Sequence, residues 1–103
     1  MNGTVTTDAA ARKHVPIYSG VLQYFPRALA AVAVISRVGN EQHNPGQPLH
    51  WDRSKSGDEL DALTRHLMDA GGFDSDGLRH SAKIAWRALA NLEKELEAAD
   101  VMV

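Results

Sequence analysis

The stretch GLRHSAKIAWRALANLEKELEA, residues 77–98, decides the fold class of this chain. Its apolar residues recur at alternating spacings of four and three, which places them on one face of an α-helix. They are Leu78, Ala82, Ala85, Leu89, Leu92 and Leu96. Asp76 precedes the stretch, and its side chain can accept a hydrogen bond from a free N–H of the first turn. We therefore expect a long amphipathic helix over about residues 77–98, with this face in the core.

Two more helices are expected before this one. Pro26 suits the first turn of a helix and Gly39 suits the position just past its end, which predicts a helix over residues 26–38. Ser56 and Glu59 have the spacing of a capping box, which predicts another helix that ends before Gly71 and Gly72. Its apolar stripe comprises Leu60, Leu63, Leu67 and Met68. Since no alternating strand pattern competes, the sequence predicts a small all-α domain of three to four helices with a long central loop.

The totals describe one ordinary globular domain. The chain has 103 residues, 44% hydrophobic content and a formal net charge of −2, which argues against general nucleic-acid binding. It has no cysteine, which excludes disulfides and thiolate metal sites. Residues 1–11 are expected to be flexible, residues 12–103 to form the domain, and residues 15–25 to form an extended arm.

The apolar segments of the sequence predict where the protein is located and whether it assembles. The chain begins without a signal-peptide pattern, and its longest apolar run, ALAAVAVI, is far shorter than the roughly 20 residues that span a bilayer. We expect an intracellular protein without membrane contact. The helix over residues 26–38 is apolar nearly all round, which is typical of a helix enclosed on several sides. This indicates a homo-oligomer, although the arm wrapping the helix within one chain is the alternative.

Cations and aromatic residues gather on the helix over residues 77–98. Positions 79, 83, 86 and 90 share one flank, and positions 80, 83, 84 and 87 share the next. The polar and aromatic residues there are Arg79, His80, Lys83, Trp86 and Arg87, and Arg65 and His66 add to them from the preceding helix. Such a group forms an anion site with a stacking surface, suited to a phosphorylated nucleotide. The alternative is a solvated charged face with Trp86 at the edge of the core.

The loop GNEQHNPGQPLHWDR, residues 39–53, exceeds the usual helix connection of about 2 to 8 residues. Loops of this length in small domains are often functional. It contains donors suited to base edges, ribose or phosphate, together with an aromatic anchor, and the residues concerned are His43, Asn44, His50, Trp51 and Arg53. We expect the loop to cover a bound ligand, and the alternative is a loop that packs only on its own tryptophan.

Carboxylates are the candidate metal ligands. Mg²⁺ takes one or two protein carboxylates together with phosphate oxygens. The candidates are Glu41, Asp58 and Asp61, and Asp52, Asp74 and Asp76 are further acids that could contribute. Asp58 and Asp61 lie one turn apart, although acids near a helix start also interact favourably with its dipole. The histidines lack tight ligand spacing, so no cofactor is expected unless the protein is a Mg²⁺-dependent enzyme.

Three stretches carry a resemblance to a known family. They are RKHVPIYSGVLQYFPRALAAVA, GNEQHNPGQPLHW and RHLMDAGGFDSDGLRHSAKIAWRALANLE, which lie between residues 12 and 93. In these stretches the chain resembles small phage proteins described as dATP/dGTP diphosphohydrolase-like N-terminal domains, distant relatives of the all-α MazG-type nucleotide pyrophosphohydrolases. The matching marks are Phe25-Pro26, Ala28-Leu29, Val32-Ala33, Trp51, Arg65-His66, Asp74, Asp76 and His80.

The resemblance implies nucleotide handling and leaves the activity open. MazG-type enzymes hold Mg²⁺ with E-x-x-E on one helix and E-x-x-D on the next, and this chain lacks that two-helix pattern. The first hypothesis is therefore a phage protein with no catalytic residues. It would sequester a nucleotide immune signal, a cyclic dinucleotide or an ADP-ribose derivative, in the cytoplasm of the infected bacterium and so inhibit its defence. The alternative is a metal-dependent dATP/dGTP diphosphohydrolase that releases dNMP and pyrophosphate, and a structural or protein-binding module is a third reading.

Overall fold

The computed structural model describes residues 8–103, and this part of the chain is all-helical. Its elements in chain order are α1 (Ala9–Arg12), the π-helical turn η1 (Tyr18–Leu22), α2 (Pro26–His43), the 3₁₀ turn η2 (Arg53–Lys55), α3 (Glu59–Leu67) and α4 (His80–Ala99). No strand occurs among residues 8–103, where Phe73 and Arg79 form only an isolated bridge. The prediction of an all-α domain is confirmed.

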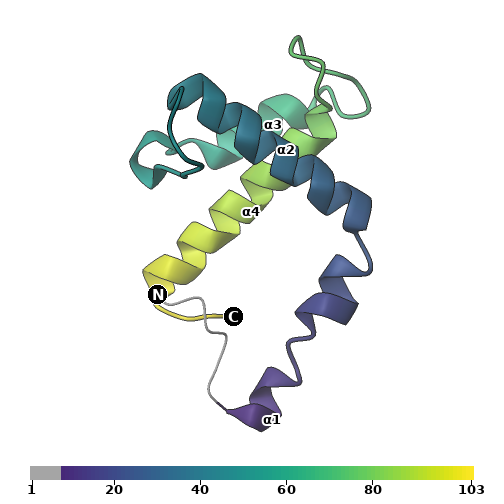
Figure 1. The fold of residues 1–103 in the computed structure, drawn as a ribbon, viewed down its shortest axis with the longest axis vertical. Coiled ribbons are helices and arrows are strands. Elements are labelled where there is room, and N and C mark those ends of the chain that lie inside the picture. The colour runs from purple at the N-terminus through teal and green to yellow at the C-terminus, as the bar shows by residue number, and fades with distance from the viewer. Residues whose placement is uncertain (1–7) are drawn as a thin grey trace.

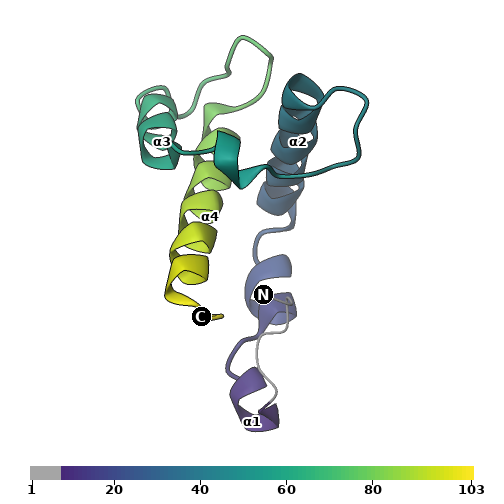
Figure 2. The same ribbon diagram turned by 90° about the vertical axis from the view of Figure 1, so that its left-hand side faces the viewer.

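The long helix α4 is the centre of the fold. It packs against both α2 and α3, and Figure 2 shows it between them. Ala90 on α4 is 4% exposed and Ala62 on α3 is 1% exposed. Small side chains at these two positions allow close approach of the α4 and α3 backbones, because nothing beyond Cβ separates them. The residue 77–98 stretch therefore organises the domain, as its periodicity indicates.

The N-terminal segments lie away from this helical core. The expectation of a flexible start over residues 1–11 falls partly on residues 1–7, which lie outside the described residues. Asp8 caps the single turn α1 by accepting the backbone N–H of Ala10 at 2.8 Å. The arm, residues 15–25, was expected to be extended, but it contains η1, because Gly20 and its neighbours adopt helical backbone angles and the Gln23 N–H donates to the Tyr18 carbonyl. Figure 1 shows this segment continuing from the start of α2 away from α3.

Helix α2 begins at Pro26 as predicted but continues one turn beyond Gly39, so the expected end at residue 38 is wrong. Gly39 keeps helical geometry within α2. Two interactions support the extra turn. The exposed Arg37 and Glu41 side chains form an ion pair at 2.9 Å with i, i+4 spacing, and the Asn44 N–H donates to the Asn40 carbonyl at 2.7 Å. The helix therefore ends where the loop begins.

The boundaries of α3 and α4 also differ from the expected ones. Ser56 donates its hydroxyl hydrogen to the Glu59 carboxylate, but Asp58 is the residue that precedes the first turn of α3, so the predicted capping box does not form. Helix α4 begins at His80, because residues 73–79 fold back as a tight turn. In this turn Asp76 accepts the Leu78 N–H at 3.0 Å, and Gly77 has a φ of 82°, a conformation that favours glycine.

Polar contacts decide which faces of α3 and α4 meet. Glu59 is 5% exposed, and its carboxylate lies 2.9 Å from Lys94 Nζ and 3.5 Å from Arg87 Nη1, both on α4. Burial alone would raise the pKa of Glu59, but hydrogen bonds from Ser56 and Lys94 outweigh this effect and hold the pKa below its ordinary value. Charged and small side chains therefore lie on the faces by which α3 and α4 contact each other.

The predicted apolar stripes are covered only in part, which corrects the expected core faces. Helix α2 contains no buried residue, and Val34 on it is 37% exposed. The large apolar side chains left exposed on α3 and α4 are Leu60, Leu67, Met68, Leu89 and Leu92. Those left exposed on the arm include Tyr18, Val21, Leu22, Tyr24 and Phe25. A single chain thus leaves large apolar side chains of α3, α4 and the arm in water. None of the helices among residues 8–103 has the length and apolarity needed to cross a bilayer.

Candidate functional site

The loop over residues 44–58 is held back on α2 by Asn40. Its side-chain amide donates to the Gln47 carbonyl at 3.1 Å, and its side-chain oxygen accepts the His50 N–H at 3.2 Å. Gly46, with a φ of 76°, makes the turn between these contacts. One asparagine in the last turn of the helix therefore fixes the path of the loop, and sequence analysis did not single it out.

Two tryptophans join the loop to the helices. Trp51 on the loop and Trp86 on α4 pack edge to face, with ring centroids 5.6 Å apart. The Trp86 indole N–H donates to Ser36 Oγ on α2 at 2.7 Å, whereas the buried Trp51 indole N–H has no partner among the described residues. The guanidinium of Arg53 lies 4.0 Å from the Trp51 ring centre. Trp51 is thus an anchor of the loop as well as part of the site.

These elements enclose a cavity of about 450 Å³. The second half of α2, the loop over residues 44–58, the turn over residues 73–79 and the first half of α4 form its wall. The predicted ligand-binding residues that line it are His43, Asn44, His50, Trp51, His66, Lys83, Trp86 and Arg87. Its lining also includes Ser36, Asn40, Gln42 and Lys55, which sequence analysis did not assign to a ligand. Asp52, Asp74 and Asp76, the further acids named as possible contributors to a metal site, line it too.

Four of the predicted ligand-binding residues lie outside this lining. Arg53 forms an ion pair with Glu97 at 2.9 Å, and Arg65 forms one with Asp58 at 3.2 Å. The Arg79 guanidinium lies 4.6 Å from the ring centre of Phe73. His80 lies next to His66. In the folded chain these four side chains therefore have other neighbours than the cavity.

Two of the cations that line the cavity, Lys83 and Arg87, lie close to carboxylates. Lys83 Nζ lies 2.7 Å from Asp74 Oδ2 and 2.7 Å from Asp76 Oδ2. The hydrogen bond from Lys83 lowers the pKa of Asp74 to about 2. Burial would lower the pKa of Lys83, but its bonds to the two aspartates outweigh burial and raise that pKa. The expected anion site is therefore a mixed-charge wall in which an entering phosphate would compete with aspartates.

The carboxylates predicted as Mg²⁺ ligands are dispersed. Glu41 pairs with Arg37 on the exposed side of α2, and Asp58 pairs with Arg65 and lies 3.9 Å from Arg87. Asp61 is exposed in the first turn of α3. None of the three belongs to the one group among residues 8–103 whose side chains lie close enough to share a metal ion.

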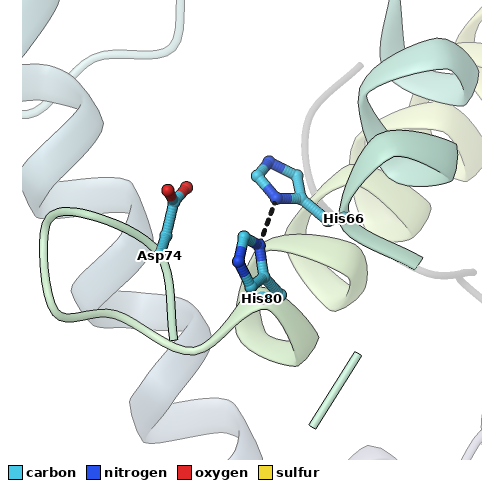
Figure 3. A group of neighbouring side chains, drawn as sticks. All are labelled: His66, Asp74 and His80. Carbon is cyan, nitrogen blue, oxygen red and sulfur yellow. Dashed lines mark hydrogen bonds between the residues drawn. The ribbon is translucent and has the colours of Figure 1, made fainter. Parts of the chain in front are cut away.

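That group consists of His66, Asp74 and His80 (Figure 3). His66 comes from the last turn of α3, Asp74 from the turn over residues 73–79, and His80 from the start of α4. The Nδ1 atoms of the two histidines are 2.9 Å apart, so one ring donates its N–H to the other. Burial, followed by the nearby charge of Lys83, lowers the pKa of His66, which favours its neutral form. The spacing of these residues in the sequence, 14 between the histidines, gave no sign of the group.

The fold and the cavity define a small helical domain that can hold a polar, partly aromatic ligand under a loop. The chain belongs to the family described as dATP/dGTP diphosphohydrolase, N-terminal, whose model matches residues 5–102. The resemblance stated from the sequence is thereby confirmed. No curated protein and no solved structure matches the chain significantly.

Proposed function

We propose that the cavity binds a phosphorylated nucleotide and that the protein holds this ligand without turnover. The observation that carries the proposal is the joint placement of Trp51, Trp86, Lys83 and Arg87 around one cavity. Its volume of about 450 Å³ falls in the range of small-molecule sites. Aromatic edges and faces suit a base, and cations suit its phosphates. Membership in a family described by dATP and dGTP diphosphohydrolysis supports a nucleotide over other anions.

The absence of turnover is inferred from the state of the lining carboxylates. Lys83 already neutralises Asp74 and Asp76, and Asp52, the third lining carboxylate, accepts hydrogen bonds from the Ser54 N–H and hydroxyl. The lining residues from α2 include no acid. A Mg²⁺ ion that activates water beside a phosphate chain needs carboxylates free to ligate it. Here an ammonium group holds the position that such an ion would need. Binding without hydrolysis follows from that arrangement.

In this proposal the ligand is an immune signal, a cyclic dinucleotide or an ADP-ribose derivative, and the protein lowers its free concentration in the cytoplasm of an infected bacterium. The phage origin and the anti-defence role rest on the family resemblance stated from the sequence. A small abundant protein that only binds its ligand is sufficient for this task, because depletion requires stoichiometric capture and no chemistry.

The second candidate function is hydrolysis of dATP or dGTP to the monophosphate and pyrophosphate, which the family description favours. Purified protein should be titrated with dATP, dGTP, ADP-ribose and a cyclic dinucleotide by calorimetry, with and without Mg²⁺ or Mn²⁺. Chromatography of each mixture then measures what remains of the ligand. Recovery of an intact bound ligand supports sequestration, release of dAMP or dGMP with pyrophosphate supports hydrolysis, and failure of all four ligands to bind refutes both.

Two arginines of α4 provide matched variants for the binding test. Arg87 lines the cavity, whereas Arg79 lies over Phe73 outside the lining. Loss of one charge-assisted contact costs about 1.5 to 3 kcal/mol, so Arg87→Ala should weaken nucleotide binding about ten-fold or more. Arg79→Ala should leave the affinity within about two-fold. Since Arg87 also contacts Glu59, the ligand-free melting temperature of each variant must be measured beside its affinity.

We further propose that the protein is a homo-oligomer in which a second copy covers exposed apolar faces. Only Ala62 and Ala90 are buried hydrophobic residues in the described part of the chain, and α2 and the arm leave Val34, Tyr24 and Phe25 in solvent. Multi-angle light scattering should give more than one chain per particle, and Val34→Glu should lower that number. Gln42→Glu, which adds the same single negative charge at an exposed polar position of α2, is the control. A monomer at micromolar concentration would contradict this assembly.

A further inference from the structure

Three side chains from separate segments converge at one wall of the cavity. His66 and Asp74 line the cavity, and His80 packs against His66 at its edge. One ligating atom from each of the three lies within 4.8 Å of the other two. Figure 3 shows the two imidazole rings facing each other with the carboxylate beside them. None of these residues belongs to the acidic motifs by which a Mg²⁺-dependent pyrophosphohydrolase would be recognised.

We propose that His66, Asp74 and His80 bind one divalent transition-metal ion, with Zn²⁺ as the best fit. Two imidazole nitrogens and one carboxylate oxygen are donors that suit Zn²⁺ and its first-row neighbours, whereas Mg²⁺ and Ca²⁺ prefer oxygen ligands alone. Three protein ligands leave at least one coordination position open. His66 and Asp74 both face the cavity, so the open position points toward the ligand space and can accept a phosphate oxygen.

The spacing of the nitrogens already approaches that of a metal site. With Zn–N distances of about 2.0 to 2.1 Å and a tetrahedral angle, two nitrogens on one ion lie about 3.3 Å apart. The observed Nδ1 to Nδ1 separation is 2.9 Å. A metal ion would take the place of the hydrogen between the two rings, and the donor ring would carry its hydrogen on Nε2 instead, with small ring rotations. The carboxylate must approach further, by a rotation of the Asp74 side chain on its exposed turn.

Lys83 is the competitor of the ion. Its ammonium lies 2.7 Å from the Asp74 carboxylate, close to any cation that this carboxylate binds. Like charges at such a distance repel strongly. The side chain of Lys83 therefore weakens metal binding in the unmodified protein, and its removal should tighten it. A gain of metal affinity on removal of Lys83 therefore distinguishes the three-residue site from a pair of histidines that bind an ion by themselves.

Titration with the metal alone tests the site, whether or not the cavity accepts a nucleotide. Metal-free protein should be titrated with Zn²⁺ by calorimetry and with Co²⁺ by visible absorption, which reports on the ligands around the ion. One ion per chain is expected. His66→Ala, His80→Ala and Asp74→Asn should each weaken binding more than about ten-fold, since even groups that only orient a ligand contribute 10- to 100-fold. His43→Ala and His50→Ala, which alter the other histidines of the cavity wall, should bind as the parent does.

A variant that is expected to bind the metal more tightly provides a test that failure to fold cannot imitate. Lys83→Met should bind Zn²⁺ about ten-fold more tightly than the parent or better, because the repelling charge is gone. No binding by the parent at about 100 µM Zn²⁺, or equal loss in His43→Ala and His66→Ala, overturns the site. An unchanged affinity in Lys83→Met shows that Asp74 is not a ligand, which also overturns it. Circular dichroism of each variant separates lost ligation from lost structure.

Discussion

Replacement of Glu59 by glutamine should lower the free energy of unfolding by about 3 kcal/mol. The Glu59 side chain is 5% exposed, and its carboxylate meets Lys94 at 2.9 Å and Arg87 at 3.5 Å. Removal of one partner from a buried ion pair costs about 3 to 5 kcal/mol, because the remaining charge stays desolvated. We expect the low end of this range, since the Lys94 and Arg87 side chains are 28% and 29% exposed and water can reach them.

Urea unfolding followed by far-ultraviolet circular dichroism measures this change. The melting temperature should also fall, by roughly 4 to 8 °C for each kcal/mol. Glu41→Gln is the matched control, because the Arg37–Glu41 pair is 60% and 61% exposed and such pairs contribute about 0.5 kcal/mol or less. Both variants must be compared with the parent at one protein concentration, since assembly adds to stability. Equal effects of the two substitutions would refute the assignment of Glu59 as the link between α3 and α4.

Three other outcomes are expected. The stability difference between the parent and Glu59→Gln should be complete at pH values above 4.5, the ordinary pKa of that carboxyl. It should shrink as the pH falls through the lower folded-state pKa of Glu59, and unfolding measured at a series of acid pH values would show this. Trp86→Phe should lower the free energy of unfolding by about 1 kcal/mol more than Trp51→Phe does, because only the Trp86 indole N–H has a hydrogen-bond partner among the described residues. Denaturant midpoints that rank the two variants the other way would contradict this. Asn40→Ala should speed hydrogen exchange in the loop over residues 44–58 by roughly ten-fold, whereas Asn91→Ala, which loses a single exposed bond on α4, should not.

Features of the fold that depend on nearby residues could be predicted. The helical class, the start of α2 at Pro26 and the long loop followed from local periodicity and from proline and glycine positions. The path of the loop after α2 could not, because the side chain of Asn40 fixes it through hydrogen bonds to residues up to ten positions later. The faces of α3 and α4 that form the core could not be predicted either. In the folded chain Glu59 and Ala90 are buried and Glu59 pairs with Lys94 across α3 and α4, whereas Leu89 and Leu92 stay exposed.

The candidate site was predictable as a set of chemical groups but not as an arrangement. Trp51, Trp86, Lys83 and Arg87 share the cavity, as composition and helix spacing indicated. The pairing of Lys83 with Asp74 depends on the tight turn that ends at Arg79, and periodicity contains no information on such a turn. The meeting of His66 and His80 likewise requires the angle at which α3 meets α4, which only the folded chain determines.

The edge-to-face pair of indoles has a practical consequence. The chain contains two tryptophans, and both line the cavity. Light absorbed by tryptophan is therefore emitted from the wall of the site and from nowhere else in the molecule. At a centroid separation of 5.6 Å the two rings also exchange excitation energy, so their joint spectrum depends on their mutual angle. The protein thus carries its own optical probe, which follows the position of the loop relative to α4 without an added label.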